Sequence, residues 1–268
     1  METRTLCIAA TLSASPGEVF AVLTDAARHS AMTRAESRIE PKAGGRFSFF
    51  NGDVSGTMRE LKPATRIVQE LRAAEWPEGH HATVTYSLTP QSEGARTHVW
   101  VEEQGVPADQ VAGVRDGWQQ YWSLFADYLR EAKVEVVRGF IEAYKNHQDA
   151  DSVDRYVSED CALHLPLLQL PPGREGMRLN GRIICGAFPD VHAEREFFVT
   201  EGDIVIERAH VRATHAGELA GIPASGKPVT WTELHAYRIA NGLISEIWSE
   251  ADLLGVMAQI GVMELPAS

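Results

Sequence analysis

The sequence Asn241-Gly242-Leu243-Ile244-Ser245-Glu246-Ile247-Trp248 is the clearest indication of how the second half of this 268-residue chain folds. Asn-Gly is a strong hairpin signal because both residues tolerate positive φ angles. The residues that follow, 243–249, have the composition and spacing of a strand. Three more strand patterns come before the turn, at 192–201, 203–215 and 227–239. The sequence therefore predicts an antiparallel sheet with a tight turn at Asn241-Gly242.

Helical patterns precede this sheet. One ends near Asn146, a short one covers 153–157, and a third covers 174–185 and closes at Gly186. A strand is expected at 161–165, and a loop rich in Pro and Leu at 166–173. Helices followed by a curved antiparallel sheet predict an α+β cone with an internal pocket.

The first half has a different order of elements. A strand pattern at 5–13 leads into Ser15-Pro16-Gly17-Glu18, which predicts a capped helix start, and that helix should end before Pro41. A long apolar stripe then runs from Val111 to Leu129 and predicts a helix. Between the helices lie five strand patterns, 46–50, 54–60, 66–71, 82–89 and 97–103, with a turn at 51–53. This order predicts a sheet that grips a C-terminal helix, whose aromatic residues Trp118, Tyr121 and Trp122 pack as core.

The junction between the halves contains no Pro, Gly or Ser over 129–135, and helical periodicity continues on both sides. Flexible linkers have a different composition. We therefore expect two domains, residues 1–131 and 133–264, joined by a short, stiff segment or one continuous helix.

Composition narrows the possible functions. Hydrophobic residues make up 44 % and charged residues 23 %, as in globular proteins, and the formal net charge is −12. An acidic chain without a basic cluster argues against nucleic acid as a partner. No apolar run approaches the length of a membrane span, and the N-terminus has no signal-peptide pattern, so we expect a cytoplasmic protein and no membrane partner. The three cysteines (Cys7, Cys161 and Cys185) are expected to be buried small side chains.

Several motifs of the first half, in order, resemble a known family. They are residues 51–56 (NGDVSG), 67–70 (IVQE), 76–80 (WPEGH) and 117–122 (GWQQYW). They are similar to the C-terminal domain of the activator of heat-shock-protein-90 ATPase, a START-related (SRPBCC) fold, over nearly all of 5–131. The residues themselves contain no catalytic or metal-binding spacing, so we expect a pocket or a docking module here.

The second half resembles another family over 134–261. The motifs are 187–190 (AFPD), 217–223 (GELAGIP), 241–248 (NGLISEIW) and 252–261 (DLLGVMAQIG). They look like the SnoaL-like polyketide cyclases, which have the α+β cone of the nuclear transport factor two superfamily. By the family's W-x-x-x-D pattern, the resemblance implies that Asp252 is the acid/base of an intramolecular aldol closure. A carboxyl group can serve this chemistry if an apolar pocket raises its pKa. Asp252 could also be the N-cap of the helical run that follows it, and the two roles do not exclude each other.

Other candidate residues come from strand parity and from the family's motifs. Trp231, Glu233 and His235 alternate on one face of a strand; if that face lines the pocket, His235 and Glu233 could orient or protonate a carbonyl oxygen, and otherwise it is a solvated outer face. The resemblance implies a polar pocket group at the position of His164, and we predict His164 and His235 as catalytic partners of Asp252. A satisfied core histidine is the alternative for His164. The expected substrate-binding residues are Trp248, Glu233, Trp231, Glu250 and Phe188.

These observations favour a small-molecule cyclase or isomerase that transfers protons on an apolar, carbonyl-bearing metabolite such as a polyketide or terpenoid. No His-x-His or HExxH spacing is present, so no metal site is expected, and the chemistry needs no cofactor. The alternative is a non-catalytic two-pocket ligand-binding or chaperone-docking protein. Exposed sheet faces of cone proteins commonly pair, so we expect a homodimer through the C-terminal domain.

Overall fold

The computed structural model describes residues 1–92, 95–165 and 169–264. The chain divides into two compact units, unit 1 over Met1–Glu131 and unit 2 from Ala132 onward. Each unit has its own hydrophobic core of buried side chains. Both mix helices with a mainly antiparallel sheet, which confirms the predicted α+β class. Part of the expected loop at 166–173 lies outside the described residues.

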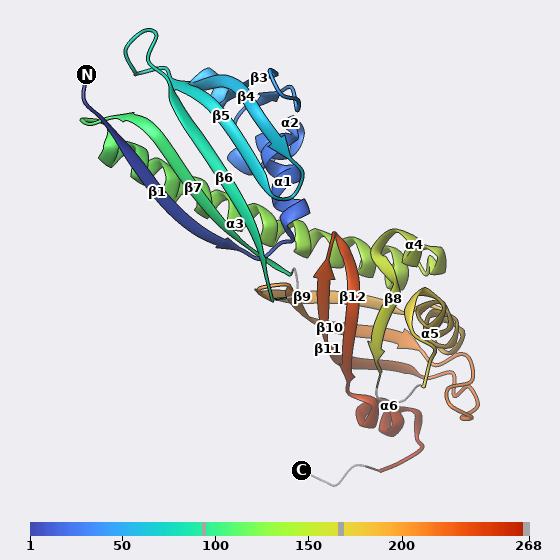
Figure 1. Ribbon diagram of the computed structural model, residues 1–268. Coiled ribbons are helices and arrows are strands. Elements are labelled where there is room, and N and C mark those ends of the chain that lie inside the picture. Colours follow the sequence, from blue (N-terminus) through green and yellow to red (C-terminus); the bar gives the residue numbers. More distant parts are fainter. Residues whose placement is uncertain (93–94, 166–168, 265–268) are drawn as a thin grey trace. The chain divides into compact units, whose positions relative to one another are not determined.

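Unit 1 contains a seven-stranded antiparallel sheet in the order β1-β7-β6-β5-β4-β3-β2 (Figure 1). The strands are β1 (Thr3–Leu12), β2 (Arg38–Ile39), β3 (Arg46–Phe49), β4 (Val54–Lys62), β5 (Arg66–Ala73), β6 (Ala82–Gln91) and β7 (Arg96–Pro107). The helical segments are α1 (Pro16–Thr24), α2 (Ala26–Thr33), the 3-10 turn η1 (Phe50–Gly52) and the start of α3 (Val111–Ile141).

The helix start at Ser15 forms the predicted capping box. The Glu18 amide donates to Ser15 Oγ at 3.3 Å, and Glu18 Oε2 accepts from the Ser15 amide at 2.8 Å. The sequence predicted one helix before Pro41, and the structure has two. Asp25 is extended (φ −101°), so it ends α1, and its carboxylate accepts from the Arg28 amide at 2.8 Å and caps α2.

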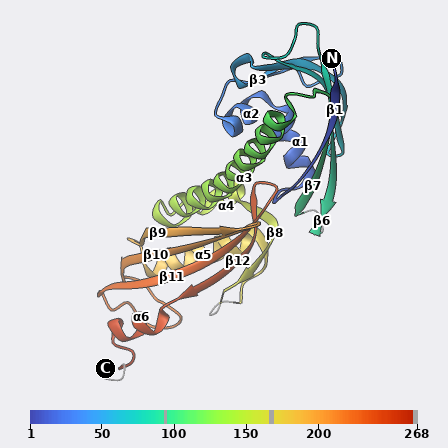
Figure 2. The same cartoon turned by 90° about the vertical axis from the view of Figure 1, so that its left-hand side faces the viewer.

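Helix α3 lies against one face of the unit 1 sheet in both views (Figures 1 and 2). Phe125 is fully buried there, and Tyr121 and Trp122 are also buried, with Trp118 packed against them. The predicted aromatic core is therefore confirmed. The helix continues without a break to Ile141, as the helical periodicity across the junction indicated.

Unit 2 contains a five-stranded sheet in the order β8-β12-β11-β10-β9. Only the β8–β12 pair is parallel among the described strands. The strands are β8 (Val157–His164), β9 (His192–Glu201), β10 (Ile204–Thr214), β11 (Pro228–Ala240) and β12 (Leu243–Ala251). The helical segments are the π-helical turn η3 (Glu142–Asn146), the 3-10 turn η4 (Ala150–Ser152), α4 (Val153–Tyr156), α5 (Gly173–Ala187) and α6 (Leu253–Ile260).

The Asn241-Gly242 turn joins β11 to β12 as predicted. Both residues have positive φ angles, 51° and 75°, which the primed hairpin turn requires. The one clear difference in this unit is β8, which begins at Val157 and not at residue 161, because the short helix α4 already ends at Tyr156.

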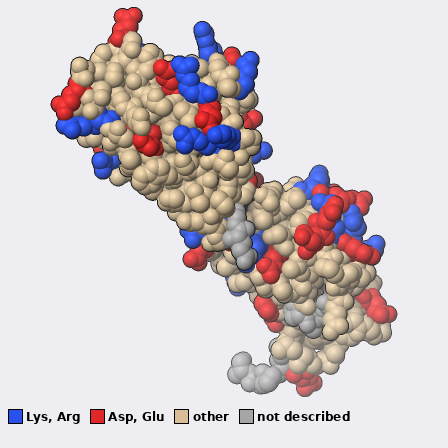
Figure 3. Space-filling view, viewed as in Figure 1, with Lys and Arg blue, Asp and Glu red and all other residues tan. Residues whose placement is uncertain are grey.

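Charged side chains of both signs lie on the surface of unit 2 (Figure 3). Around α4 and α5, basic and acidic side chains are interspersed (Figure 3); Arg178, for example, donates to Asp154 at 2.6 Å. The expectation of three buried cysteines is confirmed for Cys161, which is buried. It is wrong for Cys7, which is exposed on β1, and Cys185 is only partly buried. No helix in the described part of the chain is long and apolar enough to cross a membrane.

Candidate functional site

A cavity of about 850 Å³ lies inside unit 2. The end of α3, the turn η3, helix α5 and strands β11 and β12 contribute to its lining. Much of its wall is apolar, formed by side chains such as Phe140, Met177, Ile184, Phe188, Ile247 and Val256. A few polar groups converge at the β11 wall. An apolar cavity with convergent polar groups is the usual form of a small-molecule site.

Strand β11 supplies a row of polar residues to this cavity. Trp231, Glu233, His235 and Tyr237 alternate along the strand, so all four point to the same face, and all four line the cavity. The indole Nε1–H of Trp231 donates to Glu233 Oε2 at 3.3 Å. The alternation alone did not show whether this face of β11 points into the cavity or to solvent. It points into the cavity.

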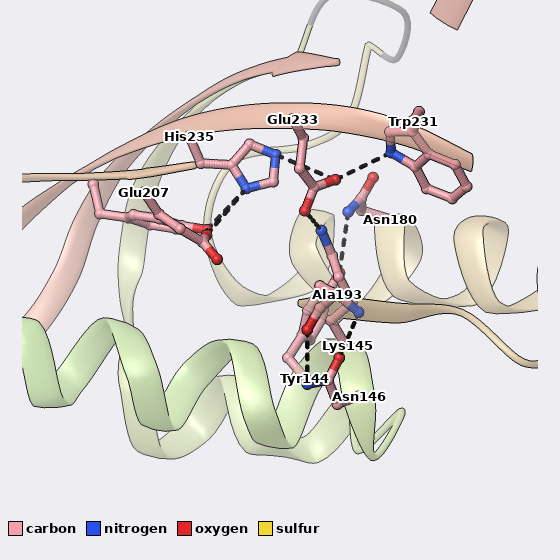
Figure 4. Close-up of polar contacts among 10 residues, drawn as sticks. Tyr144, Lys145, Asn146, Asn180, Ala193, Glu207, Trp231, Glu233 and His235 are labelled. Carbon is pink, nitrogen blue, oxygen red and sulfur yellow. Dashed lines mark hydrogen bonds and ion pairs between the residues drawn. The ribbon is translucent and has the colours of Figure 1, made fainter. Parts of the chain in front are cut away.

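The π-helical turn η3 brings a cation to the same place. Lys145 lies on this turn, lines the cavity, and forms an ion pair with the Glu233 carboxylate (Figure 4). The next residue, Asn146, holds the turn to β9, because its Oδ1 accepts from the Ala193 amide at 2.9 Å and its Nδ2 donates to the Ala193 carbonyl at 3.3 Å. Single π turns inside helices are frequent at functional sites.

His235 lies between two buried carboxyl groups (Figure 4). Its Nε2 is 3.9 Å from Glu233 Oε2, and its Nδ1 is 3.9 Å from Glu207 Oε2. The Tyr237 hydroxyl bridges the second gap, 3.0 Å from His235 Nδ1 and donating to Glu207 Oε2 at 3.5 Å. With Tyr237 donating to Glu207, the Tyr237 oxygen accepts from Nδ1–H, and the lone pair of His235 is then on Nε2.

The protonation of these groups follows from their burial. Burial lowers the pKa of His235 to about 4, although the Glu233 charge acts in the opposite direction, so the imidazole is neutral at neutral pH. Burial raises the pKa of Glu207 to about 7, with Lys145 opposing and Glu233 adding to the rise. Burial also favours the neutral form of Glu233, but the Lys145 charge and hydrogen bonds outweigh it, and the pKa of Glu233 is below its usual value.

Tyr144 completes the polar side of the cavity from the α3 end. Its hydroxyl donates to the Met177 carbonyl at 2.6 Å and accepts from Asn180 Nδ2 at 3.2 Å. Burial raises the pKa of Tyr144, so the hydroxyl stays protonated. Its hydrogen bonds fix helix α5 against the turn η3.

Four of the residues predicted from the sequence line this cavity: His235, Glu233, Trp231 and Phe188. Asp252 does not. It is exposed, and its Oδ1 accepts from the Gly255 amide at 2.8 Å as the N-cap of α6. The N-cap alternative is therefore confirmed, and the cavity geometry gives no support to the catalytic role that the W-x-x-x-D pattern implied. Glu250 is also exposed and is not part of the cavity lining.

His164 and Trp248 lie together outside the cavity lining. Their rings are stacked with centroids 5.3 Å apart, and His164 Nε2 is 2.8 Å from Glu246 Oε1. The Arg238 guanidinium lies over the Trp248 ring at 5.5 Å. Trp248 lies on the other face of the sheet from Trp231, Glu233 and His235. It pairs with Ala236 in the register of β11 and β12, and Ala236, next to His235 in the strand, points away from the cavity.

Sequence reasoning missed Lys145, Glu207 and Tyr237. Strand alternation could have indicated two of them. Tyr237 continues the row of His235 on β11, and Glu207 is the charged member of the buried series Val205, Glu207, Ala209 on β10. Lys145 gave no such signal, because its direction depends on the π-helical turn. Among the described residues, no group of three or more His, Cys, Asp or Glu could hold a metal ion.

The arrangement can move protons in an apolar space. A neutral imidazole accepts a proton, a nearby carboxyl with a pKa near 7 holds one, and an ammonium group balances negative charge that develops on a bound molecule. These are the requirements for removing a proton next to a carbonyl group and returning it elsewhere.

Two family models match the chain. Residues 13–130 match the family "Activator of Hsp90 ATPase homolog 1-like protein", and residues 134–260 match "SnoaL-like polyketide cyclase". The resemblances noted in the sequence are thus confirmed for both regions.

Individual proteins agree with this division. Over 112 residues the chain is 38 % identical to the activator of 90 kDa heat shock protein ATPase homolog 1 of Homo sapiens, covering 42 % of this chain and 32 % of that protein. The chain thus spans about a third of that relative's length. Over 134 residues it is 26 % identical to the aklanonic acid methyl ester cyclase DnrD of Streptomyces peucetius, covering 48 % of this chain and 90 % of that one.

A solved structure also aligns with the chain. TsrD from Streptomyces laurentii has 28 % sequence identity and a TM-score of 0.46, and the match covers 50 % of this chain and 98 % of that one.

Proposed function

We propose that unit 2 is a cofactor-independent cyclase or isomerase. The premise is that the chain joins a region similar to the Activator of Hsp90 ATPase homolog 1-like proteins to a region similar to the SnoaL-like polyketide cyclases. Unit 2 transfers protons on an apolar, carbonyl-bearing metabolite, polyketide- or terpenoid-like, held in the cavity of about 850 Å³. The identity to DnrD supports the cyclase class, and the cavity residues support the chemistry.

One observation carries this proposal: a neutral imidazole at the polar end of an apolar cavity, between two buried carboxyl groups. In the proposed reaction, His235 Nε2 removes a proton from the carbon next to a carbonyl group. The Tyr237 hydroxyl and Glu207 hold Nδ1–H and so keep the lone pair on Nε2. The positive charge that forms on His235 is stabilised by the Glu233 carboxylate.

The enolate oxygen needs a counter charge. The Lys145 ammonium lines the same cavity and can stabilise that oxygen, because an electrostatic interaction in a site with little water is strong. After attack of the enolate carbon on a second carbonyl of the same molecule, the new alkoxide takes up the proton from His235. The residue set therefore supports an intramolecular aldol closure with one proton shuttled.

Native mass spectrometry tests the proposal. The purified protein and its His235→Asn variant are extracted, and any co-purified small molecule is identified. We expect a carbonyl-bearing ligand, recovered in cyclised form from the parent protein and in open form from the variant. Asp252→Asn is the matched control and should behave like the parent. The same unaltered ligand in all three proteins would identify a carrier and reject the enzyme.

Unit 1 has features that favour the second candidate, a binding role without catalysis. Two of its buried titratable groups make structural contacts: His29 lies 2.8 Å from Ser37 Oγ and 3.0 Å from the Tyr121 hydroxyl, and Glu103 accepts from Trp118 Nε1 at 2.7 Å. Combined with its similarity to the heat-shock activator, this supports a docking domain for a protein partner. Calorimetric titration with a purified 90 kDa heat shock protein tests it, and no measurable heat would reject it.

A further inference from the structure

Lys145 is a largely buried amine inside a cavity that we propose binds carbonyl compounds. Its side chain is 15 % exposed, and it lines the cavity beside Glu233 and His235. The turn that carries it is fixed by the two hydrogen bonds of Asn146 to β9, and the ammonium group itself is held by its ion pair with Glu233. Amines in desolvated pockets are the ones that proteins use to form Schiff bases with carbonyl substrates.

We propose that Lys145 forms an imine with the carbonyl carbon of a ketone or aldehyde in this cavity, so that unit 2 also supports amine-catalysed making or breaking of carbon–carbon bonds next to a carbonyl. This inference rests on the proposed function, because it requires that the cavity accept carbonyl compounds. It goes beyond proton transfer, because Lys145 becomes a covalent nucleophile and not only a counter charge.

The neighbours of Lys145 supply the proton transfers that imine formation needs. Its ion-pair partner Glu233 accepts one ammonium proton and leaves a neutral amine. The amine nitrogen attacks the carbonyl carbon, the C=O electron pair moves to oxygen, and a nitrogen proton follows to give the carbinolamine. Protonated Glu233 then returns its proton to the hydroxyl, water leaves, and the C=N bond forms. One ketone and one lysine ammonium thus give one iminium group and one water.

His235 provides the next step. Its Nε2 is 3.9 Å from Glu233 Oε2, on the same wall of the cavity. A neutral imidazole there can remove the proton next to the iminium carbon and give an enamine, the carbon nucleophile of an aldol reaction. The iminium nitrogen accepts the electron pair, so no oxyanion forms in this step.

The sequence makes the inference simple to test, because the chain has only five lysines: Lys42, Lys62, Lys133, Lys145 and Lys227. Of these, Lys145 alone is among the described residues that line the cavity. Lys133 is a matched control: it is buried in the same unit, and its Nζ donates to the Gly202 carbonyl at 2.7 Å away from the cavity lining.

The experiment is reductive trapping on the full chain with cyclohexanone and sodium cyanoborohydride. Hydride adds to the iminium carbon and leaves a stable secondary amine, which peptide mass spectrometry locates. In parallel, NMR follows deuterium uptake next to the carbonyl of cyclohexanone. Both readouts are repeated on Lys145→Arg, which keeps the charge but removes the nucleophile, and on Lys133→Arg, with circular dichroism to verify folding.

We expect Lys145 to carry more label than the other four lysines combined, and both label and deuterium uptake to be lost in Lys145→Arg and kept in Lys133→Arg. Label spread over exposed lysines, with none on Lys145, overturns the inference. Deuterium uptake that persists in Lys145→Arg, without label in the parent, overturns the imine and leaves the proposed proton transfer standing. The absence of both label and uptake in the parent rejects both.

Discussion

The Lys145 ammonium and the Glu233 carboxylate form an ion pair between residues 88 positions apart, one on a π-helical turn and the other on strand β11. Both side chains are largely buried, with exposed fractions of 15 % and 6 %. The pair places two opposite charges inside an apolar cavity and keeps the Glu233 carboxylate ionised beside His235. The chemistry that we propose depends on this pairing.

Removal of one partner should be costly. Lys145→Met leaves the Glu233 charge buried without a counter charge, and we expect unit 2 to lose ~3–5 kcal/mol of stability. Hydrogen exchange of peptides from β11 measures this within the full chain. The double variant Lys145→Met/Glu233→Leu should recover most of the loss. If Lys145→Met lowered the stability of unit 2 by less than ~1 kcal/mol, water would have access to the ion pair.

Much of the fold was predictable from local patterns. The turn at Asn241-Gly242 and the strand at 192–201 have the bounds that the sequence indicated, because turn chemistry and alternation are local. The break at Asp25 between α1 and α2 was not predicted, since an aspartate can continue a helix or cap the next one, and only packing decides. The early start of β8 at Val157 depends on its pairing with β12, which is not a local property.

The site was predictable in part, for a different reason. Alternation placed Trp231, Glu233 and His235 on one face, and tertiary packing made that the inner face. The W-x-x-x-D pattern located Asp252 in the sequence, but the strand ends before it and its carboxylate turns back to cap α6. The direction of Lys145 depends on a π turn whose hydrogen bonds reach β9, and no local pattern encodes that contact.

Asp252 should behave as a cap. Asp252→Ala removes the acceptor for the Gly255 amide, and we expect a loss of about 1 kcal/mol in the stability of α6, whereas Asp252→Asn keeps the cap and most of that stability. Hydrogen exchange over α6 measures both. If Asp252→Asn were as unstable as Asp252→Ala, the carboxylate charge and not the hydrogen bond would be the stabilising feature.

Glu207 and His235 should give opposite pH dependences of stability. The pKa of Glu207 is about 7 in the folded protein and 4.5 for the free side chain. Its contribution to the free energy of unfolding is therefore fully present below pH ~4.5 and is lost as the pH rises through 7. The pKa of His235 is about 4 in the folded protein and 6.5 for the free side chain. Its contribution to the free energy of unfolding is therefore fully present above pH ~6.5 and is lost as the pH falls through 4. Each amounts to about 3 kcal/mol, so the two largely offset each other in the parent.

Single variants separate these contributions. Between pH 4.5 and 6.5, the stability of Glu207→Gln should rise with pH, because only His235 titrates, and that of His235→Asn should fall, because only Glu207 does. Hydrogen exchange of β10 and β11 peptides at several pH values measures both slopes. Slopes of the same sign in the two variants would contradict the assigned protonation states.

The outer face of the unit 2 sheet should mediate self-association. Phe197, Val199 and Leu234 are 46 %, 52 % and 43 % exposed, and the register of the strands aligns Phe197 and Leu234 on either side of Arg208. Exposed apolar patches of this kind favour association. Light scattering coupled to size-exclusion chromatography should give a dimer, and Phe197→Glu should weaken it. A parent mass of 29.5 kDa would reject this prediction.

The most direct test of the proposed chemistry is deuterium uptake next to the carbonyl of cyclohexanone and decalone, followed by NMR with the parent, His235→Asn and Asp252→Asn. The parent should accelerate uptake over buffer, His235→Asn should lose at least ~100-fold of that acceleration, and Asp252→Asn should keep it. Acceleration that survives in His235→Asn and disappears in Asp252→Asn would contradict the proposal and move the acid/base role to the cap of α6.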